Sequence, residues 1–504
     1  MGLIDSIWSL YLHLPKAEME RFIKYPLESQ NQQLNEILQT AQGTEWGMKY
    51  KFSEITNPNQ WRKTVPVHEY DQIKSDIHRM MKGQSNILWP GIIRNFAKSS
   101  GTTSDKSKFI PITAENHKNC YTRAGLRLMC CVYDQIPNVG ILDGKSILLA
   151  GSTQSNLSEY PGTMIGDVSA VIYRNLSSTL KSFLVPDEEY NLLEDSEKKL
   201  DIIAEKSINA DVRQISGSPT WMQLLFKKLM DISGKSNMLE IWPNFKILIH
   251  GAVSFVPYRK SFEDWFPSPD VYFFENYNAS EGYFALQDVV RADDMLLLLD
   301  VGIFYEFMPL EEVGKDFPDT CLLDEVELNK NYAIIITSNS GLYRYIVGDT
   351  IQFTNLQPHR IKITGRIKQF INVFGEELMV ANTDEALKIA CNKFNVKVKD
   401  YTVGPVFQNK QGQGAHEWII EFESDPIDKE SFADYLDKTI QTLNSDYEAK
   451  RFKDLALQRL KLHIAKKDCF NNWMKATNRV GAQKKVPRLS NQRNYLEEIL
   501  PFAC

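Results

Sequence analysis

Four hydroxyl side chains surround a single glycine in residues 96–103, which read Phe-Ala-Lys-Ser-Ser-Gly-Thr-Thr. Gly101 can adopt backbone angles that other residues avoid, so the chain can turn there and direct successive N–H groups at one point. Lys98 and Lys106 add positive charge on either side. This combination is suited to binding a polyphosphate, and an ordinary solvated loop of the same composition is the alternative.

The loop differs from the usual phosphate-binding loop, because the sequence contains no Gly-x-x-x-x-Gly-Lys-Ser/Thr motif. The apolar residues 109–112 that follow predict a strand, which would place the loop at the edge of a sheet. A nucleotide bound at this loop would therefore be held differently from one in the usual phosphate-binding loop.

Residues 276–282, Asn-Tyr-Asn-Ala-Ser-Glu-Gly, follow a predicted strand and combine an aromatic ring, a hydroxyl and a carboxylate. An aromatic ring such as Tyr277 can stack on a base, and a carboxylate such as Glu281 can hold Mg²⁺ against phosphate oxygens. Taken alone, a tyrosine such as Tyr277 is more often a half-buried packing residue, and an acid such as Glu281 is more often a surface residue.

Three later segments carry further polar groups. Residues 343–349 end in Gly-Asp, where the Asp349 carboxylate could accept hydrogen bonds from both hydroxyls of a ribose; a simple turn is the alternative. Residues 365–375 are typical of a loop between domains, with Arg366 beside the cleft, or of a charged β-turn. Residues 483–488, Gln-Lys-Lys-Val-Pro-Arg, lie close to the C-terminus, where a disordered basic tail is the alternative.

The composition is that of a soluble globular chain. It has 504 residues, of which 43% are hydrophobic and 24% charged, so a large core and more than one domain are expected. A net charge of −6 gives no reason to expect nucleic acid or an anionic membrane as the main partner. Seven cysteines without a Cys-x-x-Cys motif favour free thiols over a zinc site, and we expect a cytoplasmic protein.

The pattern of apolar residues predicts an α/β fold. Residues 1–90 are mostly helical by this criterion, with one helix ending at Gly43 and another over residues 71–81. From residue 92 to 355, short apolar strands alternate with helical stretches. Strands are predicted at 146–151, 245–250 and 271–275, and hairpins at 295–308 and 332–354.

A domain boundary is predicted near residue 364, which gives domains 1–364 and 365–504. In the second domain, residues 401–422 predict a hairpin, and apolar positions between 432 and 447 predict one face of a long amphipathic helix. The C-terminal domain is therefore expected to be a small α+β domain with a basic, turn-rich tail.

In this order, the segments resemble the Gretchen Hagen family of acyl acid–amido synthetases, within the adenylate-forming superfamily that includes firefly luciferase and the acyl-CoA synthetases. The resemblance covers nearly the whole chain, including residues 250–258 and 443–451. It implies an α/β fold with a large N-terminal adenylate-forming domain of mixed sheets and helices. A small, mobile α+β C-terminal domain would carry the late lysine.

The resemblance also implies roles for individual residues. The ATP phosphates would be held by the hydroxyl loop, namely Ser99, Ser100, Gly101, Thr102 and Thr103. Tyr277 would stack on adenine in a base pocket that Gly251 and Ala252 line. Ser280 would contact the α-phosphate, and Glu281 would bind Mg²⁺ and so take part in catalysis.

The remaining implied roles lie late in the chain. Asp349 would hold the ribose hydroxyls, and Arg366 would sit at the hinge between the domains. Lys485 would enter the active site and stabilise negative charge on the α-phosphate, although its neighbour Lys484 is an alternative for this position. The role of Arg344 stays open.

The implied activity is an ATP- and Mg²⁺-dependent ligation. A carboxylic acid would be converted to an acyl-AMP, and the acyl group would pass to an amine, with an amino acid as the expected acceptor. The expected partners are these small molecules, with neither nucleic acid nor membrane, and the chain is expected to be a monomer. An acyl- or aryl-CoA ligase and a non-catalytic nucleotide-binding protein on the same fold are the alternatives. Trp221 and Met222 favour an apolar or aromatic acid, or are simply core residues.

Overall fold

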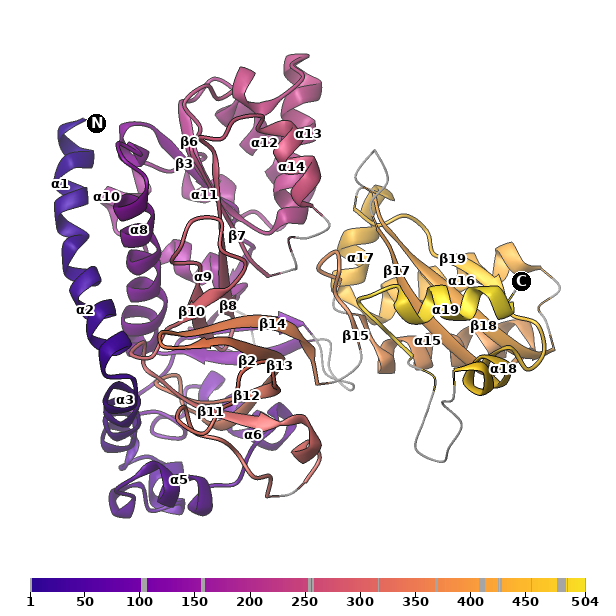
Figure 1. Ribbon diagram of the computed structural model, residues 1–504, viewed down its shortest axis with the longest axis horizontal. Coiled ribbons are helices and arrows are strands. Elements are labelled where there is room, and N and C mark those ends of the chain that lie inside the picture. The colour runs from indigo at the N-terminus through magenta and orange to yellow at the C-terminus, as the bar shows by residue number, and fades with distance from the viewer. Residues whose placement is uncertain are drawn as a thin grey trace. The chain divides into compact units, whose positions relative to one another are not determined.

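The computed structural model has two compact units (Figure 1), formed by Met1–Ser99, Lys108–Ala252 and Phe262–Ile367, and by Ser100–Ser107, Val253–Ser261 and Lys368–Cys504. The residues that it describes are 2–100, 107–155, 159–252, 255, 258–315, 317–367, 370–376, 378–407, 413–424, 426, 428–454, 456–477, 486 and 488–503. The predicted α/β fold class is confirmed, with large sheets and many helices.

The first unit begins with a series of helices, of which α1 to α3 lie along one of its edges in Figure 1. They are α1 (Leu3–Tyr11), α2 (His13–Lys24), α3 (Pro26–Ala41), α4 (Glu45–Lys49), α5 (Pro58–Thr64) and α6 (Tyr70–Met81). Helix α3 starts with a proline, which suits the first turn, and buries Leu34, Ile37 and Leu38 at helical spacing. Both predicted helices of this region are confirmed.

Further helices accompany the strands. In chain order they are α7 (Ala114–Asn116), the π-helix η2 (His117–Thr122), α8 (Arg123–Gln135), α9 (Val168–Arg174), α10 (Ser178–Lys181), α11 (Glu188–Asn191), α12 (Ser196–Ser207), α13 (Pro219–Ser233) and α14 (Arg259–Trp265). Short 3₁₀ turns are η1 (Phe52–Glu54), η3 (Ile141–Asp143), η4 (Met238–Glu240), η5 (Leu310–Glu312) and η6 (Phe452–Asp454). Among the described residues, every helix is too short or too polar to cross a membrane.

A ten-stranded sheet in the order β11-β12-β13-β14-β10-β9-β8-β7-β6-β3 forms the centre of the first unit. Its strands are β3 (Lys145–Leu148), β6 (Val212–Gly217), β7 (Ile247–His250), β8 (Tyr272–Ala279), β9 (Gly282–Leu286), β10 (Met295–Leu297), β11 (Ile303–Pro309), β12 (Asn331–Ser338), β13 (Leu342–Leu356) and β14 (His359–Arg366). Strands β3, β6, β7 and β8 are parallel, and the rest pair in antiparallel fashion. The three strands predicted before residue 280 are confirmed as β3, β7 and β8.

One of the two predicted hairpins is wrong. Strands β12 and β13 form the expected hairpin, but β10 and β11, in the 295–308 segment, do not pair with each other. Strand β10 lies between β9 and β14, so both of its edges already have partners. Strand β11 therefore pairs with β12, and residues 298–302 carry the chain between the two positions.

A smaller sheet in the order β2-β1-β5-β4 carries the start of the hydroxyl loop. Its strands are β1 (Asn95–Ser100), β2 (Ser107–Ile112), β4 (Thr153–Ser155) and β5 (Met164–Gly166). The strand predicted at 109–112 is confirmed as part of β2. Loop residues 101–106 lie outside the described residues.

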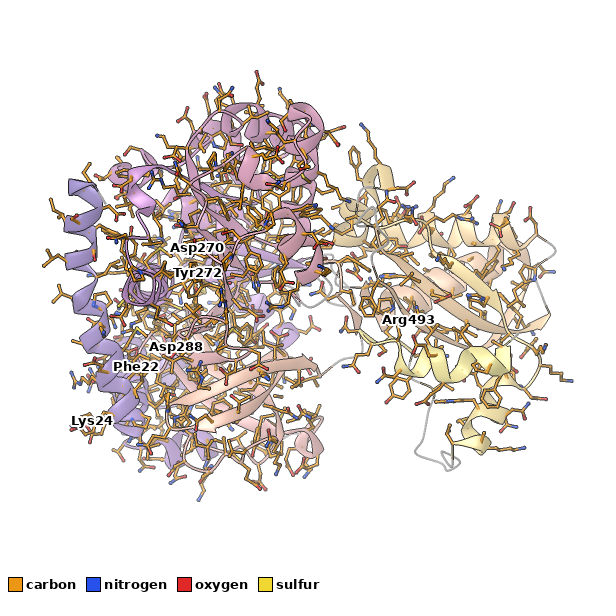
Figure 2. All side chains as sticks on the ribbon, turned by 45° about the horizontal axis from the view of Figure 1, so that its top comes forward. Phe22, Lys24, Asp270, Tyr272, Asp288 and Arg493 are labelled. Carbon is orange, nitrogen blue, oxygen red and sulfur yellow. The ribbon has the colours of Figure 1, made fainter. Side chains whose placement is uncertain are left out.

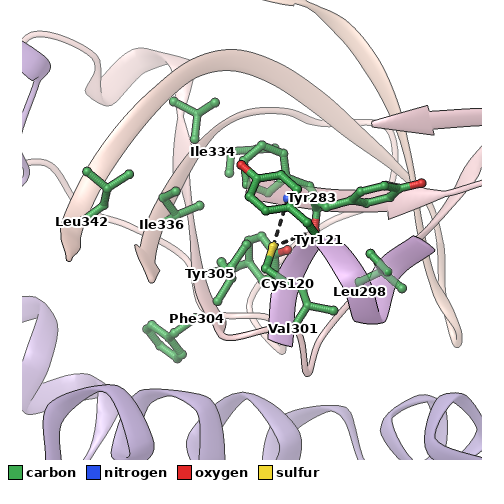
Figure 3. Packing of buried hydrophobic residues seen from close by; sticks show 14 of the residues in the cluster. Cys120, Tyr121, Tyr283, Leu298, Val301, Phe304, Tyr305, Ile334, Ile336 and Leu342 are labelled. Carbon is green, nitrogen blue, oxygen red and sulfur yellow. Dashed lines mark hydrogen bonds between the residues drawn. The ribbon is translucent and has the colours of Figure 1, made fainter. Parts of the chain in front are cut away.

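The core of the first unit contains Cys120 among aromatic side chains (Figure 3). The Cys120 sulfur accepts a hydrogen bond from the Tyr283 backbone N–H at 3.1 Å. Burial raises the pKa of the Cys120 thiol to about 12, so this cysteine is a neutral core residue and not a nucleophile. Free thiols are found at Cys120, Cys130, Cys131, Cys321, Cys391 and Cys469.

Arg344, whose role the sequence left open, joins several elements in the interior. It is 2% exposed, and its guanidinium bonds to the Glu306 carboxylate of β11 through Nε at 2.9 Å and Nη2 at 2.8 Å. Its Nη1 donates to the carbonyl oxygens of Arg62 and Val65, at 2.7 and 2.6 Å, at the end of α5. With φ at 43°, the residue lies in the left-handed region, which these bonds stabilise.

The second unit contains a three-stranded sheet, β17 (Lys397–Val406), β18 (Ala415–Ser424) and β19 (Lys461–Ile464), and a small pair, β15 (Phe370–Ile371) and β16 (Leu378–Met379). Strands β17 and β18 are antiparallel, which confirms the hairpin predicted at 401–422, although its turn residues 408–412 lie outside the described part. The helices are α15 (Val380–Phe394), α16 (Lys429–Leu443), α17 (Ser445–Arg451), α18 (Cys469–Ala476) and α19 (Asn494–Ala503).

The long amphipathic helix predicted for residues 432–447 is in fact two helices, α16 and α17. Its apolar face is as predicted, with Phe432, Leu436 and Ile440 buried. Asn444 has extended backbone angles, and its side chain accepts a hydrogen bond from the Tyr447 N–H at 2.7 Å. Asparagine is a favoured residue before a helix, so it ends α16 and starts α17.

Replacing Glu306 by alanine should destabilise the protein by about 3–5 kcal/mol, because the Arg344 charge would stay buried without its carboxylate. The matched control is Asp293→Ala, which breaks the exposed pair with Lys362, whose side chains are 85% and 40% exposed, and should cost at most about 1 kcal/mol. Urea unfolding followed by tryptophan fluorescence measures both variants. Equal unfolding midpoints would contradict a stabilising role for the buried pair.

Candidate functional site

Two carboxylates that are distant in sequence are almost fully buried in the first unit. Glu281 lies in the turn between β8 and β9 and is 6% exposed, and Asp349 lies in β13 and is 7% exposed. Burying a carboxylate is costly unless hydrogen bonds or cations compensate for the lost water. Buried acids are candidates for ligand binding, and Glu281 follows the end of β8, which is parallel to β7.

A tyrosine connects the two segments that contain these acids. The Tyr277 hydroxyl, on β8, donates a hydrogen bond to Oδ2 of Asp349 at 2.8 Å. Strands β14, β10 and β9 lie between β13 and β8 in the sheet, a separation of about 19 Å in a flat sheet with 4.8 Å between neighbouring strands. A tyrosine side chain cannot span that distance, so the sheet must curl and bring the 276–282 and 343–349 segments together.

The ring of Tyr277 is itself buried. It is 5% exposed and packs on Phe284, with ring centroids 4.9 Å apart and planes at 60°. The structure thus places Tyr277 beside Asp349, whereas its predicted stacking on adenine stays a prediction.

A second tyrosine, which the sequence analysis missed, holds the turn that carries Ser280 and Glu281. The Tyr121 hydroxyl, in η2, lies 2.9 Å from the carbonyl oxygen of Ala279 and 3.0 Å from that of Ser280, and donates to them. Burial, with smaller contributions from Cys120 and Glu281, raises the pKa of Tyr121 well above its ordinary value, so it stays a donor. In the sequence, Tyr121 looks like an ordinary core residue of a helix, so no pattern indicated that it would contact the Ser280–Glu281 turn.

The chain after β7 has a restricted backbone. A Cβ atom on Gly251 would lie 2.2 Å from Oδ1 and 2.6 Å from the carbonyl oxygen of Asn276 on β8, so only glycine allows this close approach. The next residue, Ala252, has φ at 70°, in the left-handed region that alanine avoids. Strained backbone of this kind is concentrated at functional sites, and here it ends a central strand.

Arg366 and Asp349 are directly opposite each other in the antiparallel β13–β14 ladder, so the two positions share one face of the sheet. The hydroxyl loop is described only at its start. Ser99 and Ser100 end β1, and nothing is described of their side chains. Gly101, Thr102, Thr103 and Lys485 lie outside the described residues, and their predicted roles stay predictions.

Glu281 is the residue at which the sequence analysis predicts Mg²⁺. No group of three or more His, Cys, Asp or Glu side chains among them is arranged to hold a metal ion. Mg²⁺ takes six oxygen ligands and commonly binds one or two protein carboxylates, with water and phosphate oxygens completing the shell. A single acid such as Glu281 fits that mode of binding.

Trp221 and Met222 give no strong indication of the acid. Met222 is completely buried in α13, where it belongs to the packed face of that helix, which favours the core interpretation. Trp221 is half-buried and lies one residue earlier in the same helix.

Models of one protein family match most of the chain. The GH3 family N-terminal domain matches residues 15–201 and 163–271, the central domain matches 296–366, and the C-terminal domain matches 381–494. Indole-3-acetic acid-amido synthetase GH3.3 from Arabidopsis thaliana is 24% identical over 97% of this chain and 94% of its own length.

Solved structures share the fold. The acyl acid amido synthetase AtGH3.15 in complex with 2,4-DB has a TM-score of 0.61 and 16% identity, over 98% of this chain and 96% of that chain. A 2-hydroxyisobutyryl-CoA ligase in complex with 2-HIB-AMP and CoA has a TM-score of 0.57 and 12% identity, over 95% and 92% of the two chains.

Substitutions at 251 and 252 should have different effects on stability. Gly251→Ala should destabilise the protein by about 1–3 kcal/mol, because the new methyl group would overlap Asn276. Ala252→Gly should leave stability unchanged or slightly higher, because glycine adopts a φ of 70° without strain. Thermal unfolding of the two variants checks this, and a Gly251→Ala variant as stable as the parent would show that β7 and β8 are further apart here.

Proposed function

This chain belongs to the GH3 family, the Gretchen Hagen family that its motifs resemble, and we propose that it is an ATP-dependent ligase joining a carboxylic acid to an amine. The family match extends over most of the chain. The observation that carries the proposal is the hydrogen bond that joins Tyr277, in the segment that also contains the buried Glu281, to the buried Asp349. These residues come from two segments whose order first pointed to this chemistry.

The proposed reaction solves the problem that a carboxylate is a poor electrophile, because its charge repels nucleophiles. A carboxylate oxygen attacks the α-phosphorus of ATP, the bond to the β-phosphate oxygen breaks, and acyl-AMP and pyrophosphate form. An amine then attacks the acyl carbon, loses a proton, and releases AMP. The result is an amide, for which an amino acid is the proposed acceptor.

Each site residue has a proposed role in the first step. Glu281 binds Mg²⁺, which offsets charge on the phosphates when it is bound. Asp349 binds the ribose hydroxyls, held in position by the Tyr277 hydroxyl. Ser280 contacts the α-phosphate, and Gly251 and Ala252 border the base at the end of β7. This arrangement would act mainly by positioning and by preorganised charge.

The remaining roles are proposed from the sequence alone. The hydroxyl loop, residues 99–103, holds the phosphates, and Arg366 lies at the junction of the domains 1–364 and 365–504. Lys485, from the smaller domain, offsets the charge that develops on the α-phosphate. These assignments depend on the order of the motifs and not on observed contacts.

A CoA ligase is the second candidate, and the fold similarity to 2-hydroxyisobutyryl-CoA ligase is the observation that favours it. Both activities share the adenylation step and differ only in whether an amine or a thiol attacks the acyl carbon. The family membership favours the amine. Measuring AMP release with CoA and, separately, with mixed amino acids separates the two candidates.

The first test is carboxylate-dependent exchange of labelled pyrophosphate into ATP. A panel of aryl and aliphatic acids is used with no acceptor present, and we expect exchange with one class of acid, because the adenylation step is reversible. Exchange would establish adenylation and identify the acid class. No exchange with any acid, even when amino acids or CoA are added, would favour a binding protein on this fold.

Single substitutions test the proposed residues in the same assay. Lys485→Ala and Glu281→Gln should each lower the exchange rate by about 10²–10³-fold, because the first removes a positive charge that offsets charge on the α-phosphate and the second removes the carboxylate that would hold Mg²⁺. Lys484→Ala is the matched control for the lysine and should leave the rate within a few-fold of the parent. The opposite pattern for the two lysines would move the catalytic assignment to Lys484.

A further inference from the structure

A cavity of about 320 Å³ lies in the first unit, among helices α2, α3, α7 and α8 and the turn that contains Gly302. Glu115, Asn119 and Arg123 line it at intervals of four residues, so they share one helical face. Tyr121, which contacts the turn that carries Ser280, lies two residues beyond Asn119 and faces the opposite way. The cavity is therefore separate from the candidate active site.

Two buried amide side chains form the floor of this cavity. Gln33 is 6% exposed, and its Oε1 accepts a hydrogen bond from the Gly302 N–H at 2.6 Å. Asn339 is 5% exposed, and its Oδ1 accepts one from Nδ2 of Asn116 at 3.0 Å. These bonds orient both amides, and neither NH₂ group has an acceptor among the described residues.

The floor is built closely around a glycine. Gly302 has φ at 73°, and a Cβ atom there would lie 2.0 Å from Nδ2 of Asn339. No other residue would leave room for that amide. Neither NH₂ nitrogen is among the fully buried polar atoms that lack a partner, so both donors reach the open space of the cavity. Two such donors at its floor favour a ligand with acceptor oxygens.

Charges of both signs surround the opening. Arg21 on α2 is exposed and forms no ion pair with any residue in the described ranges. Arg123 donates one N–H to the carbonyl oxygen of Asp300 and lies 3.9 Å from the carboxylate of Glu18, which also lines the cavity. Glu36 on α3 accepts a hydrogen bond from the Gln32 amide, and Glu115 accepts a long one, 3.3 Å, from the Trp89 ring N–H. The rim can therefore bind a cation and an anion on one ligand.

The walls between floor and rim are partly apolar. Phe22 and Trp89 both line the cavity and are almost completely buried. Figure 2 shows Phe22 and Lys24 on the same helix, with Phe22 toward the body of the unit and Lys24 at its outer side. Most of the other lining side chains are polar or charged, so the cavity is suited to a small polar ligand.

We propose that this cavity is a second, non-catalytic binding site, and that its ligand is a free α-amino acid. The carboxylate of the amino acid binds the NH₂ groups of Gln33 and Asn339 and the guanidinium of Arg21. Its ammonium group binds the carboxylates of Glu36 and Glu115. Charge-assisted hydrogen bonds of this kind are the strong ones. The chain thus recognises the chemical class of its proposed acceptor at a site apart from the chemistry, and this inference stands whether or not the ligase proposal holds.

The test measures binding of each of the twenty common L-amino acids to the full chain, without ATP, by isothermal titration calorimetry. At least one should bind the parent. Gln33→Glu keeps the acceptor for Gly302 but removes the NH₂ donors and adds negative charge at the floor, so we expect binding to weaken at least tenfold. Gln84→Glu is the matched control, because Gln84 also accepts a hydrogen bond, from Arg79, but does not line the cavity, and it should bind like the parent.

Two ligand analogues test the assignment of both charges. The N-acetyl derivative lacks the ammonium group and the carboxamide derivative lacks the carboxylate, so both should bind at least tenfold more weakly than the amino acid. Arg21→Ala, an exposed position, should weaken binding several-fold and keeps the test decisive if Gln33→Glu does not fold. No binding to the parent, unchanged binding to both variants, or equal binding of either analogue would overturn the proposal.

Discussion

The hydrogen bond between Tyr277 and Asp349 is the constraint on which the arrangement of the site depends. It joins two strands with three others between them, so it requires the central sheet to curl. The buried ion pair of Arg344 and Glu306 fixes β13 from the other side, five residues before Asp349 on the same strand. Together these contacts position the Asp349 carboxylate, which comes from far along the chain, beside Tyr277 on the strand that leads to Glu281.

The helical segment from residue 114 to 135 contacts the candidate site with one side and lines the cavity with the other. On one side, Tyr121 holds the carbonyl groups of the turn before Glu281, and Cys120 packs in the core. On the other side, Asn119 and Arg123 line the cavity beneath α2 and α3. The candidate site and the cavity therefore share a structural element, although they share no lining side chain among those named for each.

Local patterns predicted the elements well where one stretch of chain supplied its own signal, as in α3 and in the β12–β13 and β17–β18 hairpins. They failed where the outcome depended on competition between partners. Strand β10 was predicted to pair with β11, but its two edges are taken by β9 and β14. Asn444 interrupts an otherwise continuous apolar face, because its side chain caps the following helix.

The sequence by itself determined the fold class, the apolar faces of the helices and the ordered motifs that identify the family, because these depend on residue type and short-range spacing. Only the tertiary structure decided that the buried Arg344 pairs with Glu306. It also decided that Tyr277 donates a hydrogen bond to Asp349 and that Tyr121 donates one to the turn that carries Glu281. The cavity floor of Gln33, Gly302 and Asn339 likewise exists only in three dimensions. Each of these features joins residues far apart in the chain, and no local pattern records which distant partner a buried polar group will find.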